Sequence, residues 1–130
     1  MDKPYVVGID VGGTNTVAGI VDKRGQILIS GSIKTAKHAK VEDYLDELSE
    51  LINGLIADVT TKDLIKGIGA GTPNGNYFSG SIEFAPNLPW KGVIPFAQML
   101  EDRIGIPVAL TNDANAAAIG EMTYGAARGM

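Results

Sequence analysis

The sequence of 130 residues contains no cysteine, which excludes a disulfide framework, a thiolate zinc site and a cysteine nucleophile within this chain. It also lacks an excess of basic residues. The 11 Lys and Arg residues stand against 15 Asp and Glu, for a net charge of -4, whereas duplex-binding domains are usually basic. No apolar run approaches the ~20 residues that span a bilayer, and the start of the sequence lacks the features of a signal peptide. These absences predict a soluble cytoplasmic protein that binds neither nucleic acid nor membranes.

Glycine, by contrast, is abundant: it accounts for 17 of the 130 residues, about twice its usual share of ~7%. The glycines follow no period, so they do not mark a repeat. They gather in three clusters, Gly8–Gly19, Gly67–Gly80 and Gly120–Gly129. Because glycine has no Cβ, each cluster is a candidate place where the backbone lies close to a ligand or to another segment.

The hydrophobic pattern predicts an α/β domain. Three β-rich segments, at 5–10, 15–22 and 26–34, have short connections, which predicts an antiparallel meander. An apolar stripe at i, i+3, i+4, i+7 spacing predicts a helix over residues 41–59. A meander followed by alternating strands and helices indicates a mixed sheet, of order βββαβαβα, with helices on both faces. The remaining expected elements are strands at 64–70, 81–85 and 106–111 and helices at 92–102 and 113–124.

The first candidate binding segment is Asp10-Val-Gly-Gly-Thr-Asn15, at the turn between the first two expected strands. A glycine-rich turn presents backbone N–H groups that can cradle phosphate oxygens. No Gly-Lys-Ser/Thr is present, so it is not a P-loop, and a strand rather than a helix follows, so it is not a Rossmann fingerprint. Two interpretations remain: a β-hairpin phosphate clamp with Asp10 at the end of its first strand, or an ordinary tight turn with an incidental aspartate.

Two later segments are also candidates. Gly67-Ile-Gly-Ala-Gly71 imitates a dinucleotide fingerprint, but the following Thr72-Pro-Asn-Gly cannot begin a helix cleanly, which favours a strand that opens into a ligand loop. Asn112 and Asp113 follow an expected strand. In a purely structural interpretation, Asn112 is the N-cap of the following helix and Asp113 is an acidic residue in its first turn. In a functional interpretation, their carboxamide and carboxylate lie at the carboxyl end of a strand, where open α/β sheets bind ligands. In the second case Asp113 accepts a proton from a substrate hydroxyl.

Three motifs occur in one order along the chain: Asp10-Val-Gly-Gly-Thr-Asn15, Ala85-Pro-Asn-Leu-Pro-Trp90 and Asn112-Asp-Ala-Asn-Ala-Ala117. Their order and spacing resemble the amino-terminal domain of the ROK family of sugar kinases and repressors, in particular glucokinases, over essentially all 130 residues. The resemblance implies a single actin-like (ribonuclease H-like) domain over residues 1–130, with the carboxy-terminal domain absent from this chain. It also implies ATP-dependent phosphorylation of a hexose, with glucose as the expected substrate, and a full-length parent that is a homodimer.

The resemblance further implies a role for each motif. Asp113 matches the catalytic base that acts on the attacking sugar hydroxyl. Asn112 and Asn87 match ligands of the sugar hydroxyls, and the backbone around Asn74 lines the same pocket. The adenosine site, further sugar contacts and any zinc site belong to the missing half. The residues expected to face the ATP phosphates are Asp10, Gly12, Gly13, Thr14 and Asn15, with Asp10 near the Mg²⁺.

Departures and alternatives remain. Pro73-Asn-Gly75 stands where many members have Pro-Gly-Pro, so the loop that lines the sugar differs and the sugar is left open. His38 lies outside every motif and is expected to be a plain surface residue, whereas Trp90 and Phe96 are expected to anchor the core or a loop. The alternatives are a ROK repressor, which carries a helix-turn-helix before its first strand, and an actin-like structural ATPase, which shares only the first loop.

Overall fold

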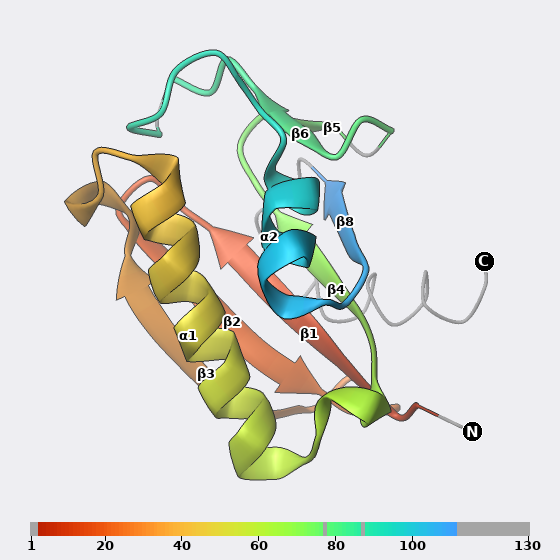
Figure 1. Ribbon diagram of the computed structural model, residues 1–130. Helices are drawn as coiled ribbons and strands as arrows, with labels where there is room; N and C mark the ends of the chain where they lie inside the picture. Colours follow the sequence, from red (N-terminus) through yellow and green to blue (C-terminus); the bar gives the residue numbers. More distant parts are fainter. Residues whose placement is uncertain (1–2, 77, 87, 112–130) are drawn as a thin grey trace.

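The computed structural model describes residues 3–76, 78–86 and 88–111 (Figure 1). Its largest sheet has five strands in the order β3-β2-β1-β4-β8. The antiparallel pairs β1–β2 and β2–β3 confirm the predicted meander, while β4 and β8 continue the sheet in parallel with β1. The strands are β1 (Tyr5–Val11), β2 (Asn15–Val21), β3 (Ile27–Lys34), β4 (Ile65–Gly71) and β8 (Val108–Thr111).

Helices α1 (Val41–Val59) and α2 (Phe96–Ile104) lie on the same face of this sheet (Figure 1). The bounds of α1 are those that its apolar stripe predicts. Side chains alternate along β1, so that Val7, Ile9 and Val11 are fully buried in one core with the apolar stripe of α1. Two short 3₁₀ helices, η1 (Thr35–Lys37) and η2 (Lys62–Leu64), flank α1 in the sequence. Among the described residues no helix is both long and apolar enough to cross a membrane. The expected helix at 113–124 lies outside the described residues.

The prediction for α2 is wrong at its beginning. A helix was expected from residue 92, but Gly92 has a φ of 78° and residues Val93–Ile94 form the short strand β7. Pro95 disfavours the helical conformation for the residue before it, so the helix begins only at Phe96. It ends at Gly105, whose φ of 80° is the left-handed conformation in which helices commonly stop.

A second, smaller sheet lies beyond the carboxyl ends of β4 and β8 (Figure 1). It joins β5 (Gly75–Asn76), β6 (Ser81–Glu83) and β7 in antiparallel order. The expected strand at 81–85 is shorter than predicted because Phe84 has a φ of 55°, outside the β region. Residues 72–76, 78–86 and 88–94 therefore form a small lobe at the edge of the main sheet where parallel strands end.

Two of the glycine clusters meet on the face of the main sheet opposite α1 and α2. Gly8 pairs with Gly19 on one side and with Gly69 on the other. The row continues to Ser30 in β3 and Ala109 in β8. Glycines far apart in the sequence therefore form one transverse row of small residues, which sequence clusters alone do not reveal.

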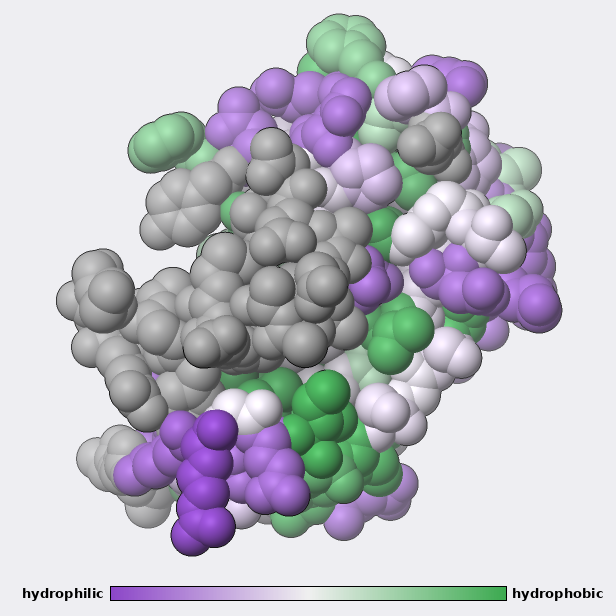
Figure 2. Space-filling model, turned by 180° about the vertical axis from the view of Figure 1, so that it is seen from behind, coloured by the Kyte–Doolittle hydropathy of each residue, from purple (hydrophilic) through white to green (hydrophobic). Residues whose placement is uncertain are grey.

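The same face carries a small apolar cluster of its own. Val6 and Val21 are buried against each other, apart from the main core. Hydrophobic side chains also reach the surface on this side of the molecule (Figure 2). The meander strands contribute three of the large exposed hydrophobic residues, Val17, Ile27 and Leu28. The two faces of the sheet thus differ: one is a full core under two helices, and the other is mostly small residues.

We expect Gly54→Ala to stabilise the chain by about 0.5–1 kcal/mol, because glycine inside a helix costs about that much relative to alanine. Gly54 is exposed on α1, and an added Cβ would meet no atom within 4 Å. Urea denaturation of the variant and the wild type measures the difference in the free energy of unfolding. A variant that is less stable than the wild type would contradict the open surroundings of this residue.

Candidate functional site

The first glycine-rich segment forms a tight β-hairpin turn between β1 and β2. Val11 pairs with Thr16, and the N–H of Gly12 donates to the carbonyl of Asn15 at 2.9 Å. A Cβ on Gly12 would lie 2.8 Å from that same oxygen, so the turn requires glycine here. Thr14 and Asn15 are exposed at the turn. The predicted hairpin is therefore present, with its backbone accessible at the tip.

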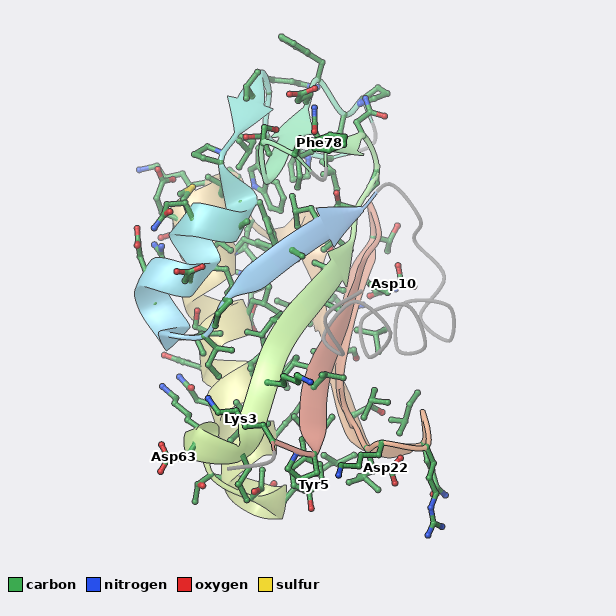
Figure 3. The ribbon with its side chains drawn as sticks, turned by 90° about the vertical axis from the view of Figure 1, so that its right-hand side faces the viewer. Lys3, Tyr5, Asp10, Asp22, Asp63 and Phe78 are labelled. Atoms are coloured by element: carbon green, nitrogen blue, oxygen red, sulfur yellow. The ribbon has the colours of Figure 1, made fainter. Side chains whose placement is uncertain are left out.

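Asp10 lies at the carboxyl edge of the main sheet, as predicted. It pairs with Gly71 in β4, and Gly71 pairs with Thr111 in β8. Strands β1, β4 and β8 thus end together, which brings the hairpin turn and the segment that follows Gly71 to one edge. The Asp10 side chain points away from α1 and α2 (Figure 3) and is half-buried.

The segment after β4 is a turn that depends on Asn74. The N–H of Gly75 donates to the carbonyl of Thr72, with Pro73 and Asn74 at the two central positions. A type II turn requires a positive φ at its second central residue, and Asn74 has a φ of 55°. Its Nδ2 donates to the carbonyls of Glu83 (2.9 Å) and Phe84 (3.0 Å). The side-chain N–H groups are thus used within the lobe, which leaves the backbone of this turn as the part that can line a pocket.

Thr72 stands at the start of this turn and is fully buried. Its Oγ1 has no hydrogen-bond partner among the residues that the structure describes. Buried hydroxyls without a partner are uncommon in folded proteins. The hydroxyl is therefore, within the described part of the chain, an unsatisfied polar group directly after the end of β4.

The second motif lies in a loop that is held by a backbone hydrogen bond at its base and by side chains buried in the main core. The N–H of Phe84 donates to the carbonyl of Gly92 at 2.9 Å, which closes the base. Ala85, Leu88 and Trp90 are at most 5% exposed and belong to the main core. Trp90 thus anchors the loop as expected, and the fully buried Phe96 is likewise a core residue. Three predicted ligands, Asn87, Asn112 and Asp113, lie outside the described residues.

The expectation that His38 is a plain surface residue is wrong. Its side chain is only 12% exposed, and its Nε2 lies 2.6 Å from Oε1 of Glu47 on α1. Its carbonyl accepts a hydrogen bond from Nε1 of Trp90 at 3.2 Å. These two contacts hold His38 in place, and through them it joins α1 to the loop that carries the second motif. Because His38 lies outside every motif, the sequence gives no sign of this role.

A cluster of buried hydroxyls was also missed in the sequence. Oγ1 of Thr16 lies 2.7 Å from Oγ1 of Thr35 and 2.7 Å from the hydroxyl of Tyr44. All three residues are fully buried. Burial raises the pKa of the Tyr44 hydroxyl well above its ordinary value, so the group stays protonated at neutral pH. In the sequence Tyr44 is one member of an apolar stripe, and nothing in that pattern indicates which hydroxyl it meets.

Comparison with known proteins identifies the family. The model of the ROK family matches residues 6–130. The chain belongs to the ROK family. It is 37% identical over 123 residues to a glucokinase of Streptomyces coelicolor, a match that covers 95% of the chain and 37% of that protein. It is 30% identical over 127 residues to a xylose repressor of Caldicellulosiruptor bescii, which covers 95% of the chain and 31% of the repressor.

Comparison with solved structures supports the same family. A ROK glucokinase from Streptomyces griseus, crystallised with glucose and AMPPNP, is 34% identical with a TM-score of 0.70, over 93% of this chain and 37% of that one. The chain has the actin-like ATPase fold of the ROK sugar kinases, seen here as the mixed five-stranded sheet with its helices. It spans less than two-fifths of the length of the two glucokinases.

The His38–Glu47 pair gives this ROK chain a testable pH dependence. The hydrogen bond from His38 lowers the pKa of the Glu47 carboxyl, and the charge of Lys37, 3.7 Å away, lowers it further. A lowered carboxyl pKa adds stability above the unfolded value of about 4.3, and that stability is lost as the pH falls. We therefore expect Glu47→Gln to be less stable than the wild type at pH 7.

The difference between Glu47→Gln and the wild type should begin to shrink as the pH falls below the unfolded value of about 4.3, and should be lost as the pH falls through the lowered pKa of the folded carboxyl. Urea denaturation at pH 7 and at pH 3 measures it. Glu50→Gln is the matched control, since Glu50 is an exposed glutamate of the same helix. A difference that is equal at both pH values would show that the carboxylate charge is not the cause.

Proposed function

We propose that this chain is the amino-terminal domain of an ATP-dependent hexose kinase that converts glucose to glucose 6-phosphate. One observation carries the proposal: β1, β4 and β8 end at one sheet edge, which gathers the Asp10–Asn15 hairpin, the Thr72–Gly75 turn and the chain leading to Asn112 and Asp113. In open α/β sheets ligands bind at the carboxyl ends of the strands. The similarity to glucokinases, one of them crystallised with glucose and AMPPNP, supports the choice of substrates.

The hairpin would face the phosphates of ATP. Phosphoryl transfer passes through a loose transition state, so it needs positioning and charge neutralisation more than covalent chemistry. A turn with no side chain at Gly12 and an exposed backbone at Thr14 suits that task. Mg²⁺, when bound with ATP, would neutralise charge on the phosphate oxygens. The carboxylate of Asp10 fits it, because Mg²⁺ is usually held by one or two carboxylates plus the substrate phosphates.

The sugar would lie between the two later motifs. Asp113 would accept the proton of the attacking hydroxyl as general base. Asn87 and Asn112 would pair with other hydroxyls, since a carboxamide both donates and accepts hydrogen bonds. The backbone of the Thr72–Gly75 turn, shaped by Asn74, would complete this side of the pocket. A cytoplasmic homodimer, and zinc confined to the rest of the protein, stay predictions for the full-length form.

A regulatory function is the alternative, because the xylose repressor of Caldicellulosiruptor bescii matches 95% of this chain. A repressor needs the sugar pocket but no general base. The presence of Asp113 directly after the expected sugar ligand Asn112 favours catalysis. A sugar-dependent change in operator binding, without ADP release, is the result that would favour the repressor.

An ADP-release assay tests the proposal on the full-length protein and on the 130-residue chain, with glucose, N-acetylglucosamine, mannose and fructose. We expect turnover with the full-length protein, highest with glucose. We expect no appreciable turnover with the chain alone, because the adenosine contacts would lie in the remaining part. Full-length protein that releases no ADP with any of the four sugars would refute the kinase, and robust turnover by the chain alone would refute the half-enzyme interpretation.

A further inference from the structure

The segment after β3 touches both candidate ligand loops. At one end, the N–H of Ala36 donates to the carbonyl of Thr14 in the phosphate hairpin, at 3.4 Å. At the other end, the carbonyl of His38 accepts from Nε1 of Trp90, in the loop of the second motif, at 3.2 Å. Residues 35–38 therefore form a short bridge between the two loops. The ring of His38 is held by Glu47, so the bridge is fastened to α1.

Tyr44 fills the space behind this bridge and touches both sides. Its hydroxyl lies 2.7 Å from Oγ1 of Thr16, the first inward-facing residue of β2 after the hairpin turn. Its ring lies against Trp90, with ring centroids 4.5 Å apart and planes tilted by 48°. A second contact, 6.4 Å between centroids, joins it to Phe96 at the start of α2. Tyr44 is fully buried, so these contacts are made without competition from water.

Each hydroxyl of the cluster has at least one hydrogen-bond partner within it. Thr16 Oγ1 has one proton and two lone pairs, which suffices for its bonds to both Thr35 and Tyr44. An apolar side chain at position 16 or 44 would leave a hydroxyl buried without that partner, which is costly in a dry core. A cluster of this kind fixes a geometry more narrowly than apolar packing does, because hydrogen bonds are directional.

We propose that Tyr44 is a positioning residue that couples the sugar loop, through Trp90, to the phosphate hairpin, through Thr16. The inference rests on the proposed kinase function. Phosphoryl transfer depends on how the sugar hydroxyl is placed against the γ-phosphate, and a misplacement of about 1 Å can cost about 100-fold in rate. Tyr44 touches neither ligand. It acts by setting the distance between two loops that do.

Trp90 is the single tryptophan of these 130 residues. A Trp90→Phe variant of the full-length protein gives the emission of any tryptophan in the rest of the protein, and subtracting it makes the coupling measurable without turnover. Trp90 is 5% exposed and touches Tyr44, so its fluorescence reports on the sugar loop. We expect AMPPNP, added without sugar to the full-length protein, to change the emission of Trp90. Tyr44→Phe keeps the ring and removes the hydroxyl, so that change should shrink at least several-fold. Thr16→Val, which removes the partner hydroxyl, should have the same effect.

Kinetics supply the second measurement. We expect Tyr44→Phe to lower kcat about fivefold to tenfold, the scale of one hydrogen bond, with little change in the KM for ATP. Ile52→Val is the control for stability alone: Ile52 is fully buried on α1 and makes none of these contacts. It should lower the unfolding temperature and leave both kcat and the Trp90 response close to those of the wild type.

The outcomes separate the inference from the function on which it rests. If AMPPNP does not bind to the wild type by calorimetry, the proposed function fails and the inference fails with it. If AMPPNP binds and the wild type turns over, but Tyr44→Phe keeps a wild-type Trp90 response and kcat, the inference alone is overturned. Equal losses in Tyr44→Phe and Ile52→Val would also overturn it, because they would indicate lost stability rather than lost positioning.

Discussion

Asp113→Ala in the full-length protein is expected to lower kcat by at least ~100-fold, the usual scale for the loss of a general base. The carboxylate would take the proton from the attacking sugar hydroxyl, and alanine offers no acceptor. Binding of AMPPNP should persist, because the phosphates would be held by the hairpin at Asp10–Asn15 rather than by Asp113. The measurement is ADP release at saturating glucose and ATP, with AMPPNP binding followed by calorimetry.

A second aspartate serves as the control. Asp63 is exposed in η2, at the end of the sheet opposite Asp10 (Figure 3). Asp63→Ala removes the same charge and should leave turnover close to that of the wild type. If Asp113→Ala also turned over normally, the assignment of Asp113 as base would be wrong, and the N-cap and first-turn acid would be the better interpretation of Asn112 and Asp113.

The parts of the fold that were predictable from sequence are those set by local pattern. The stripe of α1 and the short connections of the meander each lie within a few residues, so periodicity is sufficient to place Val41–Val59 and the first three strands. The beginning of α2 was misplaced although its signal was local too. Pro95 disfavours the helical conformation at Ile94, and this effect outweighs the helical pattern that predicts an earlier beginning.

In the candidate site, too, the features set by local sequence were predictable and the contacts between remote residues were not. The hairpin turn follows from adjacent glycines, and the anchoring of Trp90 follows from its size and apolar character. The contacts of Tyr44 and His38 could not be predicted, because their partners are remote in sequence: 28 residues separate Thr16 from Tyr44, and 52 separate His38 from Trp90. Only the packing of α1 against the sheet brings those groups together. The glycine row through Gly8 is a similar case, because strand register decides which glycines are neighbours.

The proposed role of the hairpin in phosphate binding can be tested by adding one methyl group at Gly12. In Gly12→Ala the new Cβ would lie 2.8 Å from the carbonyl oxygen of Asn15. That oxygen belongs to the backbone and already accepts the N–H of Gly12, so it cannot move aside without opening the turn. We expect AMPPNP binding to weaken at least ~10-fold and kcat/KM for ATP to fall about 100-fold, because the phosphates depend on the placement of this backbone.

Gly54→Ala is the matched control, since it adds the same methyl group at a glycine with open surroundings. It should keep wild-type affinity for AMPPNP. Thermal unfolding of both variants checks that Gly12→Ala remains folded at the assay temperature. If folded Gly12→Ala bound AMPPNP as tightly as the wild type, the turn would be an ordinary one with an incidental aspartate. A weakened affinity in a folded Gly12→Ala variant, with wild-type affinity in Gly54→Ala, supports the phosphate clamp, because the same added methyl group then weakens binding only where it meets the backbone of the turn.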